Sequence, residues 1–151
     1  MAEAQLQFVW SEFDALSLRD LYAILKLRVD TFIVEQNCPY PELDGKDLHA
    51  QHLHVLDDGD LAAYLRVLAP AGDGLPRISR VIVAPGHRGR KLGEKIMLEA
   101  IAHCRERFPG LDIELCAQSH LRTFYGSVGF TPISDEIIKD GIPHIDMRLT
   151  A

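Results

Sequence analysis

Long apolar runs are missing from this sequence. No stretch approaches the roughly 18–20 consecutive apolar residues that a membrane-spanning helix needs. The first ten residues also lack the basic start and apolar stretch of a secretory signal peptide. These absences predict a cytoplasmic protein with no membrane partner.

Cysteine is scarce as well. The chain has three cysteines, Cys38, Cys104 and Cys116, and no two of them have CxxC spacing. An odd number without that spacing predicts neither a disulfide framework nor a zinc knuckle, so we expect reduced and mostly buried thiols. The 151 residues, 47% hydrophobic and 25% charged, have the composition of one globular domain and suffice for a core without cross-links. We therefore expect a single domain over residues 1–151.

An excess of basic residues is also absent, because the net charge is −6 at pH 7. This balance argues against a general nucleic-acid-binding protein. Residues 77–95 are an exception, with one acid, Glu94, and six basic residues: Arg77, Arg80, Arg88, Arg90, Lys91 and Lys95. A short positive segment of this kind suits a small polyanion better than a long phosphate backbone. The alternative is a solvated basic helix end.

Acidic residues gather in a different part of the chain. Residues 35–60 contain one lysine, Lys46, and seven acids: Glu35, Glu42, Asp44, Asp47, Asp57, Asp58 and Asp60. Such a segment could form the mouth of a site for a cationic amine. A solvated surface of loops and turns explains the composition equally well.

Hydrophobic periodicity and turn residues predict an α/β fold with a mixed sheet. The apolar residues Leu18, Leu21, Tyr22, Leu25 and Val29 have the spacing of one helix face. The unit formed by residues 78–117 should pair its two strands in parallel through a right-handed helical crossover. The expected strands are 6–10, 52–56, 61–68, 78–84, 111–117, 130–138 and 144–149; the expected helices are 18–28 (continuing through 31–36), 90–107 and 120–128.

The most informative segment runs from Val83 to Gly93, with the sequence VAPGHRGRKLG, and joins a strand to a long helix. A helix N-terminus offers unpaired N–H groups and a partial positive charge, and glycines let an anion approach the backbone. The segment has neither the GxxxxGK[ST] of a Walker loop nor the GxGxxG of a dinucleotide site. It therefore predicts an anion cradle of another kind, or a helix end capped only by water.

Two motifs in this sequence resemble the GNAT acyltransferase superfamily. The first is V-x-P-x-x-R-G-x-x-L-G at residues 83–93, and the second is F-Y-x-x-x-G-F at residues 124–130. Residues 32–40, Asp44-Gly45, Ala117-Gln118 and residues 141–145 further resemble the ElaA-type branch, so the likeness covers nearly the whole chain. Two departures are Lys91, where the superfamily expects glycine, and Gln118, where it often has asparagine.

The resemblance implies the GNAT fold, with six to seven strands and about four helices, and acetyl-CoA as the acyl-donor cosubstrate. Backbone N–H groups of residues 88–93 would hold the diphosphate. The pantetheine arm would lie along residues 80–83, where that strand diverges from residues 111–117. The implied coenzyme-binding residues are Ile82, Val83, Arg88, Gly89, Arg90, Lys91, Leu92, Gly93, Gln118 and Tyr125.

The resemblance also implies the reaction, N-acetylation of a primary amine on a small molecule or peptide by direct transfer in a ternary complex. The N–H of Val83 would polarise the thioester, and Tyr125 would be the general acid. A phenol with a pKa of about 10 can protonate a thiolate of about 8.5 at modest cost. Glu35 is our candidate base; the other conceivable bases are Asp44, His54, Glu114 and His120.

Other functions use different residues. His49, His52 and His54 could hold a metal ion, but HxH on a strand is usually incidental and we expect no metal. Cys38 and Cys116 are the thiols that a covalent acyl intermediate would need.

The main alternative is a catalytically weak CoA-binding module whose acidic face binds a partner. We expect a monomer or a homodimer formed through residues 130–149.

Overall fold

Residues 6–151 are described by a computed structural model, in which all eight strands belong to one mixed sheet. The strand order is β1-β2-β3-β4-β5-β8-β6, and β7 also pairs with β8. The α/β prediction is confirmed, with one more strand than the expected six to seven. The strands are β1 (Leu6–Glu12), β2 (Gln51–Asp57), β3 (Asp60–Leu68), β4 (Arg77–Val83), β5 (Ile113–Gln118), β6 (Thr131–Pro132), β7 (Ile137–Lys139) and β8 (Ile142–Leu149).

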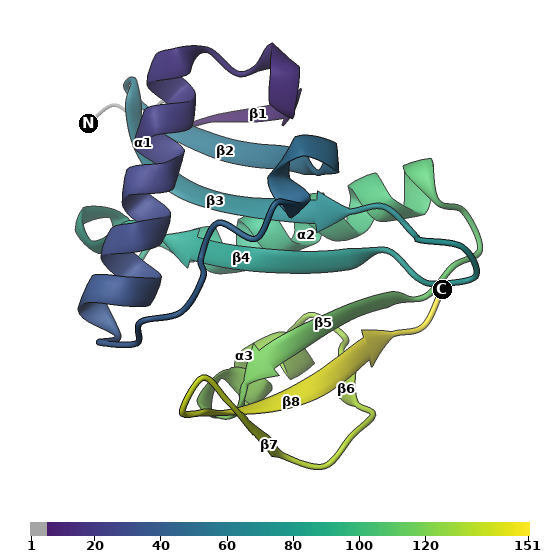
Figure 1. Cartoon of the computed structure of the whole chain (residues 1–151). Coiled ribbons are helices and arrows are strands. Elements are labelled where there is room, and N and C mark those ends of the chain that lie inside the picture. The colour runs from purple at the N-terminus through teal and green to yellow at the C-terminus, as the bar shows by residue number, and fades with distance from the viewer. Residues whose placement is uncertain (1–5) are drawn as a thin grey trace.

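Three α-helices occur in residues 6–151, one fewer than expected: α1 (Leu18–Arg28), α2 (Leu92–Arg107) and α3 (Arg122–Ser127). Helix α1 continues directly into the π-helical turns of η2 (Val29–Glu35). Figure 1 shows α1 on one face of the sheet and α2 on the other. The short 3₁₀ turns are η1 (Phe13–Ala15), η3 (Lys46–His49), η4 (Pro85–His87) and η5 (Ser119–Leu121). Within the described residues, no helix has the length and hydrophobicity to cross a membrane.

The prediction of which α1 residues face the core is wrong. Leu18 and Tyr22 are 84% and 72% exposed, whereas Ile24 and Arg28 are each 1% exposed. The helix packs its Ile24–Arg28 side against the sheet because Arg28 finds acidic partners there, as described below. A buried arginine breaks the hydrophobic periodicity on which the prediction depended.

The opposite face of the sheet carries the main core. Helix α2 buries one apolar face, and β5 buries Ile113, Leu115 and Ala117 in alternation, the pattern of a strand with one buried face. These side chains share one cluster with the inner residues of β2 and β3. The buried residues of α2 are Leu92, Ile96, Met97, Ala100, Ile101 and Cys104.

Strands β4 and β5 are parallel, as predicted, but they pair at one position alone, Arg77 with Glu114. Beyond Arg77 they diverge, which Figure 1 shows clearly. Strand β5 is held from its other side, because all six of its residues pair with β8. The sheet therefore opens between β4 and β5 along most of their length.

The closing hairpin differs from its prediction in one detail. The expected continuous arm over residues 130–138 is two short strands, β6 and β7, both paired with β8. Between them, Ile133 donates its N–H to the Asp146 carbonyl at 2.9 Å, and Ser134 Oγ accepts the Asp146 N–H at 3.0 Å. The serine side chain takes the place of a strand hydrogen bond and interrupts the arm.

Candidate functional site

A β-bulge lies in the middle of β4. Tyr64 of β3 pairs with Ile82, and Arg66 pairs with Ser79, so that one β3 residue faces Arg80 and Val81 together. Arg80 has φ +57°, a left-handed conformation that is rare for a residue with a side chain. The bulge lies between the single β4–β5 pair and the end of β4. It therefore lies where the sheet opens.

The predicted anion cradle connects β4 to α2. Gly89 has φ +84°, and Lys91 has φ +60° at the N-cap of α2 without capping the helix through its side chain. The left-handed backbone at Lys91 explains why the superfamily expects glycine there. Helix α2 has 16 residues, so its N-terminus presents N–H groups and a full helix dipole at this turn. The geometry fits a phosphate-sized anion.

Arg88 and Glu35, two of the predicted site residues, are brought together by the fold. Arg88 donates from Nη1 and Nη2 to the two carboxylate oxygens of Glu35 at 3.0 and 2.9 Å. Its Nε donates to the Val83 carbonyl at 3.0 Å. The hydrogen bonds from Arg88 hold the pKa of Glu35 below its usual value. A carboxylate with a lowered pKa is a weaker base, so this geometry does not favour Glu35 as the general base.

A second acid holds the other end of the cradle. Arg90 donates to Asp57 Oδ2 at 2.6 Å, and His87 Nδ1 lies 3.3 Å from the same oxygen. Strong positive charge was expected throughout residues 77–95, but much of it is paired with acids from other elements. In the described part of the chain, Lys91 and Lys95 are the two basic residues of this segment without an ion pair.

Tyr125 lies on α3, and this helix meets the cradle through the neighbouring residue, Phe124. A Cβ placed on Gly93 of α2 would lie 3.3 Å from Phe124 Cζ and 3.8 Å from Val83 Cγ2, so the end of β4 and the starts of α2 and α3 meet here. The Tyr125 ring packs edge-on against Phe124, with centroids 5.0 Å apart. Burial raises the pKa of Tyr125 to about 12. Its hydroxyl has no hydrogen-bond partner within residues 6–151, and it stays protonated at neutral pH.

The segment after η2 bridges the opening between β4 and β5. Gln118, at the end of β5, donates from Nε2 to Gln36 Oε1 at 3.2 Å. Cys38 Sγ lies 2.9 Å from the carbonyl of Asp140, in the turn between β7 and β8. Sequence reasoning missed Gln36, because nothing local indicates that it reaches a residue 82 positions away.

Beneath this segment lies a group of six side chains that we call the arginine–carboxylate cluster: Arg28, Arg66, Arg80, Glu42, Asp44 and Asp47. Arg28 and Arg66 are 1% and 2% exposed, and Glu42 is 4% exposed. The contacts are Arg28–Glu42 at 2.7 Å, Arg28–Asp47 at 2.7 Å, Arg66–Asp44 at 2.6 Å, Arg66–Asp47 at 2.9 Å and Arg80–Glu42 at 2.7 Å.

These ion pairs change the interpretation of residues 35–60. Five of the seven acids in that segment are paired with arginines; in the described part of the chain, Asp58 and Asp60 of the β2–β3 turn are the two without an ion pair. The expected acidic mouth for a cationic amine is therefore largely neutralised. The acidic face that a partner-binding module would use loses most of its charge for the same reason.

The other candidate bases are also constrained. Asp44 pairs with Arg66, and the hydrogen bonds from Arg66 hold its pKa far below the usual range. Glu114 is paired with both Arg77 and Arg148. His54 is buried, and burial lowers its pKa. His120 is exposed, and it is the one candidate of these four that forms no ion pair within residues 6–151.

The histidines and cysteines have other roles. Both ring nitrogens of His52 are engaged, with Nδ1 2.6 Å from the Tyr64 hydroxyl and Nε2 2.9 Å from the Asp47 carbonyl. Residues 6–151 contain no group of three or more histidine, cysteine or acidic side chains arranged to hold a metal. Burial raises the pKa of Cys104 to about 12 and also raises that of Cys116. Both are thiols at neutral pH, which disfavours a covalent intermediate on either.

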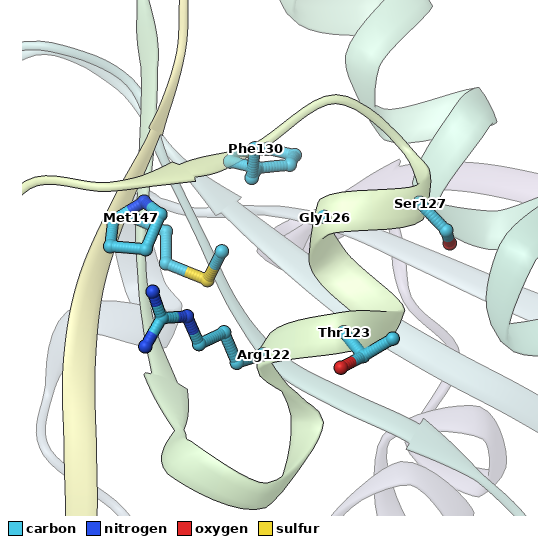
Figure 2. Close-up of a pocket in the computed structure, with 7 residues that line it drawn as sticks. Arg122, Thr123, Gly126, Ser127, Phe130 and Met147 are labelled. Atoms are coloured by element: carbon cyan, nitrogen blue, oxygen red, sulfur yellow. The ribbon is translucent and has the colours of Figure 1, made fainter.

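A hollow of about 460 Å³ lies elsewhere, between α3 and the β6–β8 hairpin. Figure 2 shows the Arg122 side chain extending from the start of α3 toward Met147, with Thr123 and Ser127 on the same helix. None of the predicted site residues lines this hollow. We therefore place the candidate site at the cradle and the β4–β5 opening.

Comparisons with known proteins identify the family of this chain. A family profile described as "Acetyltransferase (GNAT) domain" matches residues 26–151. Protein ElaA of Escherichia coli K12 is 44% identical over 135 residues, which cover 87% of this chain and 88% of ElaA. The chain belongs to the GNAT family of acyltransferases.

Two solved structures refine the assignment. An acyl-CoA N-acyltransferase from Pseudomonas aeruginosa has a TM-score of 0.91 and 39% identity, covering 97% of this chain and 100% of that one. E. coli ElaA has a TM-score of 0.89 and 37% identity, covering 96% and 99%. Within the family, the chain falls in the ElaA-type branch, as its sequence predicts.

Proposed function

We propose that this protein is an acetyl-CoA-dependent N-acetyltransferase that transfers the acetyl group directly to a primary amine of a small molecule or peptide. One observation carries the proposal. Strand β4 separates from β5 after a single residue pair, and residues 84–91 connect it to the N-terminus of α2. The side chain of Lys91, the N-cap residue, does not cap this helix. This arrangement suits an extended chain that ends in a diphosphate.

In this proposal the donor is bound mainly by backbone. The N–H groups of residues 88–93 face the diphosphate, and Lys91 adds an ammonium group beside it. The arm lies along Ile82 and Val83 as an added strand partner, with Gln118 on the other side of the opening. The family uses acyl-CoA donors, and acetyl is the acyl group that we propose.

The reaction forms a C–N bond and breaks a C–S bond. The amine nitrogen attacks the thioester carbon, and the N–H of Val83 stabilises the oxygen on which charge develops. The thiolate then leaves and takes the proton of the Tyr125 hydroxyl, and the proton that the amine nitrogen loses passes through water to restore that hydroxyl. Because burial raises the pKa of Tyr125 to about 12, the acid form is always present. The same shift makes Tyr125 a weaker acid than an exposed tyrosine, so proton transfer to the thiolate costs more than it would from a phenol with a pKa of about 10.

We assign Glu35 to the positioning of Arg88 rather than to proton abstraction. The variant Glu35→Gln should retain turnover within about tenfold of wild type, whereas loss of a general base costs about 10²–10⁴-fold. The measurement is release of the CoA thiol from acetyl-CoA, first with water and then with a panel of amines. A hundredfold loss across the pH range would return Glu35 to the role of base.

The cradle can be tested with two glycines from the same loop. Gly89 has φ +84°, whereas Gly86 has no positive φ, and a Cβ on either would meet nothing within 4 Å. Left-handed backbone costs a residue with a side chain roughly 1–2 kcal/mol. We therefore expect Gly89→Ala to weaken CoA binding about tenfold in calorimetric titration, and Gly86→Ala to bind as wild type does. Equal affinities for the two variants would show that the cradle does not hold the coenzyme.

A further inference from the structure

One residue of β4, Arg80, has a backbone conformation that is rare in a strand. Five non-glycine residues in the described part of the chain have positive φ, and of these Arg80 alone lies inside a β-strand. The others are Asn37, Asp58, Lys91 and Asp140, which lie in turns or at a helix N-cap. A left-handed residue in a strand persists only where its surroundings hold it there.

Those surroundings are the acids of the arginine–carboxylate cluster. Arg80 donates from Nε to Glu42 Oε2 at 2.7 Å, and from Nη2 to the Glu42 carbonyl at 3.0 Å. Nη2 also lies 3.4 Å from Asp44 Oδ2. The side chain is 18% exposed, and its guanidinium lies 5.8 Å from the centre of the Tyr40 ring. Arg80 thus spans from the bulge to the loop after η2.

The partners of Arg80 are themselves fixed. Glu42 Oε2 also accepts from Arg28 Nε at 2.7 Å, and its Oε1 accepts from the Tyr40 hydroxyl at 2.6 Å. Asp44 receives two hydrogen bonds from Arg66, whose Nε donates to Ser79, the residue before Arg80. The bulge is therefore tied to two acids that Arg28 and Arg66 also hold.

We propose that Arg80 is a positioning residue, whose side chain holds the β4 bulge so that the backbone of Ile82 and Val83 is aimed at the thioester. This inference rests on the proposed function. Ile82 and Val83 follow Arg80 by two and three residues, and at that level β4 pairs with β3 on one side and not with β5 on the other. The rigid fork of Arg80 holds the Glu42 carboxylate through Nε and the Glu42 carbonyl through Nη2, a fixed geometry that the flexible point charge of a lysine does not reproduce.

The test uses acetyl-CoA labelled with ¹³C at the thioester carbonyl and isotope-edited infrared spectroscopy. Arg80→Gly keeps the left-handed backbone accessible but removes the anchor. Arg80→Lys keeps the charge but not the fork. Arg77→Ala is the matched control, because Arg77 is on the same strand and pairs with Glu114 through a side chain that is 42% exposed. Calorimetry measures acetyl-CoA affinity, and thiol release with water as acceptor gives kcat and KM.

In wild type the carbonyl band lies below that of free acetyl-CoA, because a backbone N–H polarises it. In Arg80→Gly the band returns toward the free value and kcat falls about 100-fold, as expected when reacting groups are misplaced by about 1 Å. The acetyl-CoA affinity and KM stay within about threefold, because residues 88–93 are intact, and Arg77→Ala matches wild type. A purely structural role would not separate kcat from affinity in this way.

Wild-type band position and kcat in Arg80→Gly would overturn the inference while leaving the proposed function intact. If wild type itself does not bind acetyl-CoA, the proposed function fails and the inference fails with it. Should the glycine variant not fold, judged by circular dichroism, Arg80→Lys decides in its place. The carbonyl band of Arg80→Lys should then lie between that of wild type and that of free acetyl-CoA, and its kcat should be lower than that of wild type. Wild-type values of both would overturn the inference.

Discussion

Replacing Tyr125 with phenylalanine should lower turnover at least a hundredfold while changing acetyl-CoA affinity less than about twofold. The substitution removes one oxygen from a ring that is 7% exposed and packed against Phe124 and Phe130, so the fold loses little. Removal of a general acid typically costs 10²–10⁴-fold in rate. The measurement is kcat from release of the CoA thiol, with affinity from calorimetry.

Tyr22→Phe is the control for this experiment. Tyr22 is 72% exposed on α1, so its variant should match wild type in both rate and affinity. If Tyr125→Phe retains more than half of the wild-type kcat, Tyr125 is only a packing residue and the proton reaches the thiolate from elsewhere. A loss of affinity equal to the loss of rate would indicate damage to the coenzyme site instead.

The largest loss of stability should come from Arg28→Met. The Arg28 guanidinium is 1% exposed and donates to Glu42 and Asp47 at 2.7 Å each. Without it, two acids stay buried with less compensation. Removing one partner of a buried ion pair costs about 3–5 kcal/mol. We expect a loss of that size in the free energy of unfolding measured by urea denaturation.

The matched control is Lys26→Met on the same helix. Lys26 pairs with Asp30 at 2.6 Å, but the two side chains are 65% and 52% exposed, and solvent screening leaves such surface pairs with little effect on stability. Both variants remove one positive charge, so a difference between their losses in the free energy of unfolding reports the effect of burial. If Arg28→Met costs less than 1 kcal/mol, the arginine–carboxylate cluster does not stabilise the fold.

The local parts of this structure were predictable from sequence, because they depend on neighbours in the chain. The apolar face of α2, the alternation of β5 and the glycine-containing turn at residues 86–93 are all encoded within a few residues. The family resemblance rests on the same local motifs. The confirmed features of the fold are therefore those that need no knowledge of distant contacts.

The features that sequence reasoning missed depend on pairs far apart in the chain. Arg88 meets Glu35 across 53 residues, and Arg80 meets Glu42 across 38. Each pairing exists only once β4 lies beside β3 and the segment after α1 folds back over both. The exposed Leu18 and the buried Arg28 have the same origin, since a distant acid can make burial of an arginine favourable.

The most direct test of the coenzyme site is thermal unfolding with and without acetyl-CoA. The control combines Arg88→Ala with Gly89→Pro, which removes the guanidinium and the left-handed turn together. At 100 times its dissociation constant, a ligand adds about 2.7 kcal/mol, which for a chain of this length raises Tm by roughly 5–10 °C. The account predicts this rise for wild type and none for the control. A folded wild-type protein whose Tm does not respond to acetyl-CoA would contradict it.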